Sequence, residues 1–389
     1  MLSYKYRHRV MNGSCKLGEA AGKMRLQEEY DTPTPTDRLS HLPDPILHQI
    51  LSFLETKSAV QTSVLSRAWR CAWRHVPALD IVSLFFEEYG SFVSFVDMVL
   101  SLRYPLNLHK VSFIDNVFVN DNVFVNDEEI DEHRRFPRVI EYALAHNAQH
   151  LMVVVDKPWS IQETCLVRSE LNCNLKTLDL TYAFLDRVGF GSSGFQSMTT
   201  LHLHDCFLHS EQNLICFPNF PCLENLVLNA CLGPISCPYR QSIQISVVPL
   251  RSLKLTGCFF NKIDVSAPYL KFFTIDDAEI PLEFVELSLP SLDCADVRMN
   301  RSSDFELIAL FFGVHKAKSL TLDSKTIQIL KKIHDELPEQ QPSKGLKSLI
   351  LMSNSVSCIR VVNRFPQDPL VKNRLLDIIS CYNEYELNL

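Results

Sequence analysis

The sequence predicts an α+β protein: a small three-helix module near the N-terminus, followed by an irregular α/β repeat solenoid with a curved parallel sheet. Two observations support this prediction. Residues 38–80 carry large apolar side chains at helical spacing, and so short a segment cannot build a core of its own. From residue 148 onward the pattern L-x-x-L-x-L returns roughly every 20 to 29 residues, which is typical of a repeat solenoid.

Residues 1–37 predict a disordered leader. The part up to Arg25 is basic and contains one acid, Glu19, whereas residues 28–37 carry only acidic charges and two Thr-Pro steps. Polar segments with unbalanced charge do not supply enough apolar surface for a packed structure.

Three helices are expected within residues 38–80. Pro43 suits the first turn of the first helix, whose apolar stripe comprises Ile46, Leu47, Ile50, Leu51 and Leu54. Thr56 is expected to cap a short second helix. The third helix carries, on the side opposite Arg67, Arg70 and Arg74, an apolar face of Val64, Leu65, Ala68, Trp69, Ala72 and Trp73.

Two tryptophans one turn apart are more than three short helices can cover, and tryptophan is enriched at binding hot spots. We therefore expect an apolar face that docks on another protein. The alternative is that the three helices form the lid of a larger helical domain.

The residues of this module resemble an F-box of the plant type, whose third helix has the pattern Leu-Ser-x-x-Trp-x-x-x-Trp. Ala68 departs from the family, which usually has a basic residue there. The resemblance implies docking on a Skp-family adaptor. It implies an adaptor-binding set of Leu42, Pro43, Ile46, Ile50, Leu51, Leu54, Leu65, Trp69 and Trp73.

Residues 81–147 are expected to form a helical and loop connector, with helices at 92–102 and 138–145. Residues 148–389 are expected to form a leucine-rich-repeat domain, with further helices at 305–312, 327–337 and 370–381. An earlier copy of the repeat is expected at 151–153. The copies begin at Leu175, Met198, Leu223, Leu250, Leu270, Leu292, Ala317 and Leu346.

Within each copy, the L-x-L leucines should point inward from a short parallel strand, because strand side chains alternate between two faces. Cys206, Cys231 and Cys258 follow their strands at the turn position of the repeat. Residues between and beside the inward positions should face outward and form a surface for a target protein. The expected target-binding set is Asp179, His202, His204, Asn229, Lys254, Asp296, Arg298 and Thr321.

An F-box followed by irregular repeats resembles the plant F-box/LRR-repeat family, some of whose members continue into an FBD region. Such a region would begin here at about residue 340. The resemblance implies a non-catalytic substrate receptor of an SCF ubiquitin ligase, joined through the adaptor to a cullin and binding an unidentified target protein. The alternative is a scaffold that binds the adaptor without joining a ligase.

Other classes of protein are disfavoured. The 13 cysteines are scattered without a C-x-x-C pair, as in the reducing cytoplasm or nucleus. No apolar run is long enough to span a membrane, and a net charge of −7 does not favour a nucleic-acid partner.

A nucleotide-binding enzyme is a remote alternative. Residues 189–194 match G-x-G-x-x-G, but too few residues follow them for the helix that such a loop requires. His202, His204 and Cys206 suggest a metal site, but Cys206 fits the repeat turn and no further ligand cluster is evident. We expect no cofactor, no metal and no catalytic residues.

Overall fold

The computed structural model describes the following residues: 42–115, 136–155, 159–160, 174–185, 195–208, 214–217, 220–232, 242–260, 262–276, 284–299, 310, 313–314, 317–323, 326, 358–362 and 385–386. The chain divides into two compact units, Met1–His41 and Leu42–Leu389, and all described residues belong to the second. The predicted leader, the glycine motif at 189–194, and the helices predicted at 327–337 and 370–381 lie outside the described residues. Nearly all of the helix predicted at 305–312 does as well.

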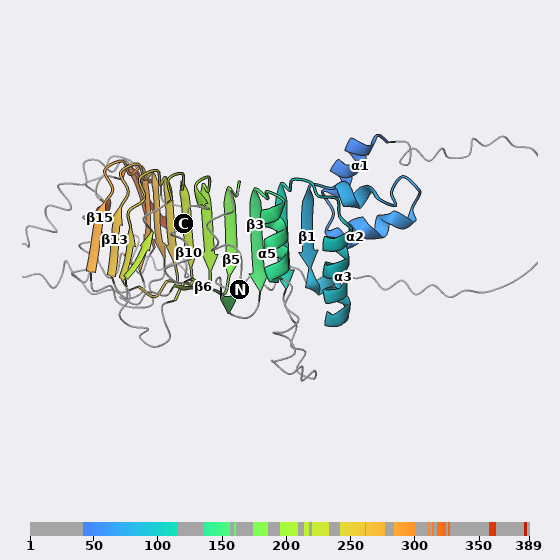
Figure 1. Ribbon diagram of the computed structural model, residues 1–389. Coiled ribbons are helices and arrows are strands. Elements are labelled where there is room, and N and C mark those ends of the chain that lie inside the picture. Colours follow the sequence, from blue (N-terminus) through green and yellow to red (C-terminus); the bar gives the residue numbers. More distant parts are fainter. Residues whose placement is uncertain are drawn as a thin grey trace, which may run out of the picture. The chain divides into compact units, whose positions relative to one another are not determined.

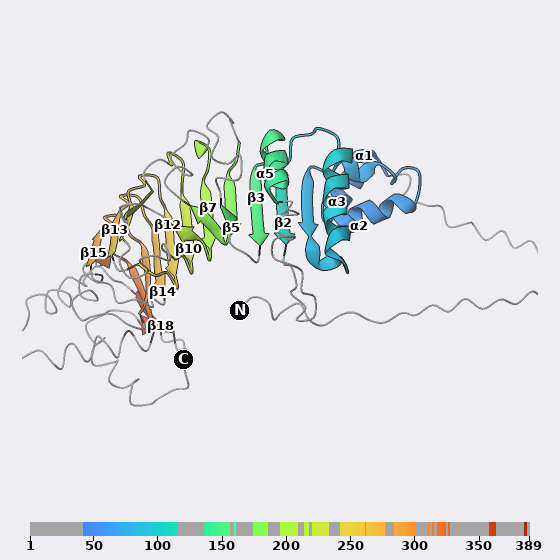
Figure 2. The same ribbon diagram turned by 60° about the horizontal axis from the view of Figure 1, so that its bottom comes forward.

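A parallel sheet of twelve strands runs through the described part of the second unit, and its strands follow one another along an arc (Figure 2). In sheet order the strands are β1 (Ala78–Val82), β2 (Lys110–Asp115), β3 (His150–Val155), β5 (Thr177–Thr181), β7 (Thr200–His204), β10 (Asn225–Asn229), β12 (Ser252–Thr256), β14 (Phe272–Asp276), β16 (Cys294–Arg298), β17 (Ser319–Asp323), β18 (Cys358–Val362) and β19 (Tyr385–Glu386).

The α-helices whose bounds the structure describes lie at the β1 end of this sheet (Figure 1). They are α1 (Asp44–Leu51), α2 (Thr56–Gln61), α3 (Tyr89–Leu102) and α5 (Phe136–Ala145), with 3-10 turns η1 (Thr62–Val64), η2 (Ala72–His75) and η3 (Ser83–Phe85). Phe92 of α3 packs against the inward-facing Phe113 of β2, with ring centroids 5.9 Å apart. Helix α3 therefore covers the core side of the first strands.

Strands replace helices on the core side farther along the chain. A second parallel sheet contains β15 (Phe284–Ser288), β13 (Lys262–Ser266), β11 (Ser242–Ile245) and β9 (Leu214–Phe217). A third contains β4 (Trp159–Ser160), β6 (Ala183–Leu185) and β8 (Phe207–Leu208). The irregular α/β solenoid expected from the sequence is confirmed. In its later described repeats, the segments opposite the large sheet include the strands of the second and third sheets.

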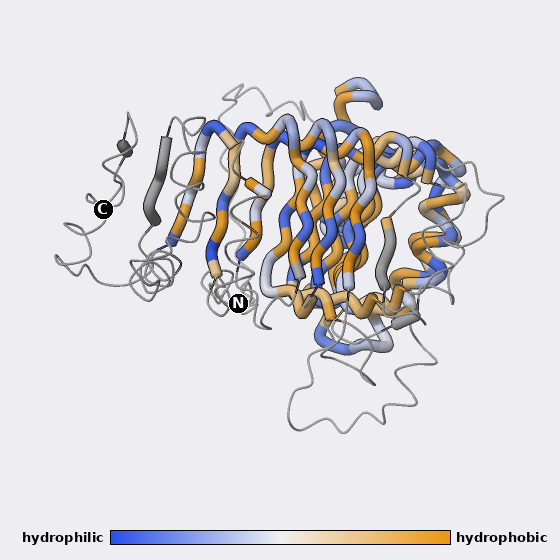
Figure 3. The backbone as a smooth tube through the Cα atoms, turned by 90° about the vertical axis from the view of Figure 1, so that its left-hand side faces the viewer, coloured by the Kyte–Doolittle hydropathy of each residue, from blue (hydrophilic) through white to orange (hydrophobic). Residues whose placement is uncertain are grey.

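The large sheet is in register at its leucine positions. Leu178, Leu201, Leu226 and Leu253 are mutual partners on successive strands, and all four are buried. Polar and apolar residues consequently alternate along the strands, as Figure 3 shows. This alternation places one row of side chains in the core and the next row in solvent.

The cysteines close each turn as the repeat pattern predicts. The Sγ atom of Cys231 lies 3.5 Å from the Leu203 carbonyl oxygen, and that of Cys258 lies 3.3 Å from the Leu228 carbonyl oxygen. Each thiol thus donates to the strand before its own. Burial raises the pKa of the Cys206 thiol to about 12, so this sulfur stays protonated and serves packing rather than metal binding.

The repeat region begins earlier than the sequence suggested. Strands β1 and β2 already belong to the large sheet, so the described residues of the segment predicted as a connector, 81–147, include strands of the solenoid. Their inward positions have the repeat spacing, at Val76, Leu79 and Ile81 for β1 and at Leu108, Val111 and Phe113 for β2, but only two of these six residues are leucines.

The end of the described sheet also differs from the expectation. The strand paired with β17 is β18, with Ile359 opposite Leu320. The copy predicted to begin at Leu346 lies outside the described residues, as does most of the region expected to resemble an FBD module.

Candidate functional site

Helix α1 carries two apolar stripes, and the chain covers only one of them. Pro43 precedes the helix, and its carbonyl oxygen accepts the amide of Leu47 at 3.1 Å. Leu47 and Leu51 are fully buried in the core, whereas Ile46 on the neighbouring stripe is 45% exposed. A helix with one stripe in its own core and another in solvent has a face available for a partner.

The third predicted helix is not continuous. The chain forms η1, a series of turns, and then η2, and the amides of Leu65, Ala72 and Arg74 bond carbonyl oxygens three residues earlier. The expected single apolar face is therefore divided: Val64 and Leu65 point into solvent, and the tryptophans turn into the core.

The expectation that the two tryptophan side chains lie on an exposed docking face is wrong. Trp69 and Trp73 are only 5% and 4% exposed, because they pack in the same core as the first strands of the sheet. Leu51, also predicted to touch the adaptor, is fully buried. The spacing of residues does not show this, because it depends on how η2 packs against α1 and α2 and on how α2 packs against β1.

Other members of the predicted adaptor-binding set remain accessible. Pro43, Ile46, Leu54 and Leu65 are exposed, and Leu42 and Ile50 are half-buried. Two apolar residues that the prediction did not include, Phe53 and Val64, are 80% and 86% exposed. We call Ile46, Phe53, Leu54, Val64 and Leu65 the uncovered apolar set.

Two polar anchors hold the helical module on the sheet. Thr56 does not cap α2; the Glu55 carboxylate does, by accepting the amides of Lys57 and Ser58 at 2.6 Å each. The Thr56 hydroxyl oxygen instead accepts the Asp80 amide of β1 at 2.8 Å. The buried Arg103 guanidinium, just after α3, donates to the carbonyl oxygens of Trp73 and Val76.

The predicted target-binding residues form two adjoining rows on the outward face of the large sheet. The register joins Asp179, His202, Lys254, Asp296 and Thr321 in one row, and His204, Asn229 and Arg298 in the other. All eight are half-buried or exposed. The structure thus brings them onto one surface, while their role in binding stays a prediction.

Arg298 is held among acidic side chains at the later end of these rows. Its Nε atom donates to Asp296 Oδ1 at 2.8 Å, and a terminal nitrogen lies 3.6 Å from Asp276 Oδ2. Burial opposes the charge, but the hydrogen bond to Asp296 and the nearby carboxylates outweigh it and raise the pKa of the guanidinium. The positive charge of Arg298 is thus compensated by neighbouring carboxylates, whereas Lys254 is an exposed positive group in its row.

Comparison with known proteins bears on both surfaces. Residues 39–79 match the F-box domain model. A putative F-box/FBD/LRR-repeat protein of Arabidopsis thaliana is 32% identical over 280 residues, which are 63% of this chain and 53% of the relative. Arabidopsis F-box/LRR-repeat protein 13 is 26% identical over 365 residues, which are 89% of this chain and 71% of the relative.

The chain carries an F-box and resembles plant F-box/LRR-repeat proteins along most of its length. A putative FBD-associated F-box protein of the same plant is 28% identical over 363 residues, or 81% of the relative's length. The chain spans about half the length of the first of these relatives.

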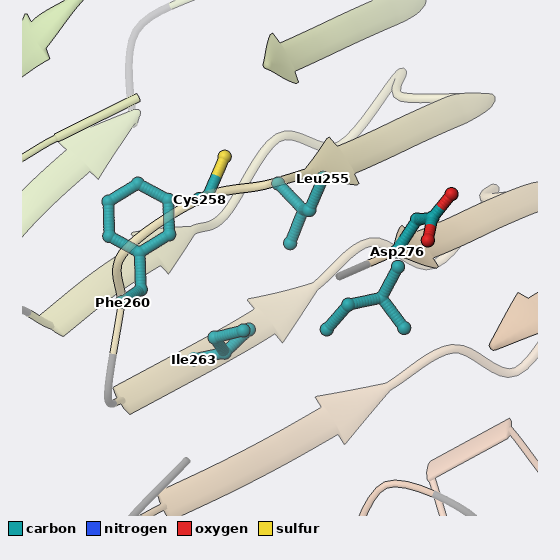
Figure 4. A pocket seen from close by; sticks show the side chains of 6 residues that line it. Leu255, Cys258, Phe260, Ile263 and Asp276 are labelled. Atoms are coloured by element: carbon teal, nitrogen blue, oxygen red, sulfur yellow. The ribbon is translucent and has the colours of Figure 1, made fainter. Parts of the chain in front are cut away.

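A small cavity lies inside the repeat core. Its walls are Leu255, Cys258, Phe260, Ile263, Ile275 and Asp276 (Figure 4). A volume of about 10 Å³ has room for roughly one water molecule. It is too small for an organic ligand, so the outward faces are the candidate functional surfaces.

Sequence reasoning missed one cluster on the outward face of the repeats. Asp179, His202 and His204 bring their donor atoms within 4.8 Å of one another. Cys206, which the sequence placed with the two histidines, is buried and bonded to backbone carbonyl oxygens. The signal was nevertheless in the sequence, because Asp179 and His202 occupy the same x of L-x-L in consecutive copies.

No described helix is both long enough and apolar enough to pass through a lipid bilayer.

Proposed function

We propose that this chain is a non-catalytic substrate receptor of an SCF-type ubiquitin ligase, whose F-box docks on a Skp-family adaptor that carries a cullin. The resemblance to these proteins supports the general role. The observation that carries the proposal is the uncovered apolar set, which lies within the residues that match the F-box model. A receptor of this kind contributes positioning and effective concentration rather than bond chemistry.

The uncovered apolar set has the properties of a protein-binding face. Phe53, Val64 and Leu65 are each more than half exposed, although apolar side chains of this size gain roughly 1.5–3 kcal/mol when fully buried. The adjoining segment carries Arg67 and Arg70 in solvent, which supplies a polar rim beside an apolar centre.

The test is a substitution on this face that leaves the core intact. Leu65→Asp is expected to raise the adaptor Kd by at least about 30-fold, because it places a charge in a desolvated contact. Since Leu65 is 64% exposed, stability should change by less than about 0.5 kcal/mol. Adaptor pull-down and titration measure the first quantity, and thermal unfolding measures the second.

The matched control is Val248→Asp, which puts the same charge at an exposed apolar residue outside the F-box. Adaptor binding should survive in that variant. Equal binding by Leu65→Asp and the parent chain would remove the basis of the docking proposal. Trp69→Ala is a poor probe, because it opens the core.

We also propose that the outward face of the repeats binds the target protein. Support comes from the two rows of polar side chains, which run across the strands without a covering element among the described residues. Lys254→Glu should change the set of proteins labelled in proximity experiments under proteasome inhibition, because charge complementarity sets partner choice. Lys262→Glu makes the same charge change on β13 of the smaller sheet and should leave that set unchanged. Identical sets for both variants would argue against this face.

A scaffold that binds the adaptor without ligase assembly is the competing proposal. Co-precipitation of a cullin with the adaptor separates the two, because a scaffold would bring down the adaptor alone.

We further propose a cytoplasmic or nuclear location. Six cysteines of the described part of the chain are free, including the exposed Cys71 and Cys222, as in a reducing compartment.

A further inference from the structure

We propose that Asp179, His202 and His204 form a binding site for a zinc ion, or a similar divalent transition metal, on the outward face of the repeat sheet. Asp179 comes from the middle of β5, and the two histidines come from alternate positions of β7. The strand register sets Asp179 beside His202. Period-two alternation returns His204 to the same face, so the backbone itself assembles the three ligands.

The distances between the donor atoms suit a shared ion better than direct hydrogen bonds. Asp179 Oδ2 lies 3.6 Å from His202 Nδ1, and Asp179 Oδ1 lies 3.7 Å from His204 Nε2. Hydrogen bonds between such groups are shorter than about 3.2 Å. Ligands bound tetrahedrally to zinc at about 2.0–2.1 Å lie roughly 3.3 Å from one another, so a small side-chain adjustment completes the geometry.

The chemistry of the three donors also fits. Two imidazoles and one carboxylate form a mixed nitrogen and oxygen donor set, which zinc and its neighbours in the first transition row bind. The carboxylate lies between the imidazoles with one oxygen toward each, so it can adjust its contact to the ion. All three side chains remain partly accessible, which leaves a coordination position for water or for an incoming ligand.

Asn229 on the next strand is a positioning residue for this site. Its side-chain nitrogen lies 3.3 Å from His204 Nδ1. Rotating the amide by half a turn puts Asn229 Oδ1 there instead, and amide orientation is assigned rather than observed in most structures. The oxygen would accept a hydrogen bond from the Nδ1–H group and leave Nε2 free for the ion, which is how metal-bound histidines are usually oriented.

The local charge does not oppose a cation. The register neighbours of the three ligands on β3 and β10 are Met152, Val227 and Asn229, with Thr181 beside His204, and none is positive. Lys254 follows Val227 in the His202 row, two strands or about 10 Å away from His202, where its repulsion is largely screened by salt.

The test uses the full chain without an affinity tag, stripped with a chelator and titrated with Co²⁺ by visible absorption and with Zn²⁺ by calorimetry. One site is expected in the parent chain. His204→Ala and the nearly isosteric Asp179→Asn should each weaken binding by at least about 100-fold, and Asn229→Ala by about tenfold. Because imidazole binds metal only when neutral, binding should weaken as the pH falls.

The control is His150→Ala, which removes another histidine from the outward face of the adjoining strand β3. This variant should bind the metal as the parent chain does. Equal binding by His204→Ala and the parent chain, or equal loss in His204→Ala and His150→Ala, would overturn the assignment. Thermal unfolding in chelator confirms that each variant is folded. The inference does not depend on the proposed ligase role, because no target or adaptor enters the measurement.

Discussion

Ala230 adopts a backbone conformation that its side chain disfavours. Its φ is +50°, and the residue after the neighbouring strand, Gly257, has φ +57°. Asp205 and Tyr182 repeat the same left-handed turn one and two strands earlier, respectively. The turn persists because it aims each amide at the next strand: the Ala230 amide donates to the Thr256 carbonyl oxygen at 2.7 Å.

This turn predicts opposite effects for two reciprocal substitutions. Ala230→Gly should stabilise the fold by about 0.5 kcal/mol, since relief of left-handed strain of about 1 kcal/mol exceeds the added entropy of the unfolded chain. Gly257→Ala should destabilise it by about 1 kcal/mol. The new Cβ would lie 3.9 Å from the Ala230 backbone, which is ordinary contact, so the cost is backbone strain.

Denaturant unfolding of both variants measures these free energies, with the parent chain as reference. A loss of stability in Ala230→Gly would mean that the left-handed turn carries no strain at that position. The outward-face titration with Zn²⁺ should be the same in both variants, because neither residue touches the histidines.

At the scale of elements, the sequence predicted strands well wherever the leucine triplet was intact. The copies at Leu223 and Leu250 became β10 and β12 with their inward leucines buried. Strands β1 and β2 were missed because their inward positions, although at the repeat spacing, are filled mostly by Val, Ile and Phe instead of leucine. Any apolar residue of suitable size satisfies a buried strand position, so the leucine pattern is sufficient but not necessary.

The helical module shows a different limit of sequence reasoning. Spacing alone placed Leu65 and Trp69 on one face, and the structure separates them because a series of turns interrupts the predicted helix between η1 and η2. The candidate site was therefore predicted in part. The exposed members follow from the F-box pattern, whereas the burial of the indoles depends on the tertiary packing of η2 against α1 and α2, which helical spacing alone does not show.

Arg103 links the elements that enclose the indoles. It follows α3, donates to carbonyl oxygens at the end of η2, and also interacts with Tyr142 of α5. Burial lowers the pKa of its guanidinium, and these acceptors compensate for the lost water. The F-box and the first strands thus share both an apolar core and a buried polar link.

Across the whole molecule, the F-box closes the β1 end of the solenoid core. Leu47, Leu51, Trp69 and Trp73 belong to the same core as Leu79 and Ile81 of β1. Terminal repeats of a solenoid need a cover with a polar outer side, and here a binding module supplies it. The surface that we propose docks on the adaptor and the surface that packs against the repeats are therefore opposite sides of one element.

This arrangement predicts that the F-box and the sheet unfold together. Trp73→Ala should lower the free energy of unfolding by about 3–5 kcal/mol and shift the far-UV circular dichroism transition, which reports the strands, along with the tryptophan fluorescence. Val64→Ala, at an 86% exposed residue, is the control and should shift neither. A fluorescence transition that precedes the strand transition would contradict the shared core. If the transitions coincide, deleting the F-box would damage the target-binding face as well, and only surface variants such as Leu65→Asp can separate adaptor docking from target capture.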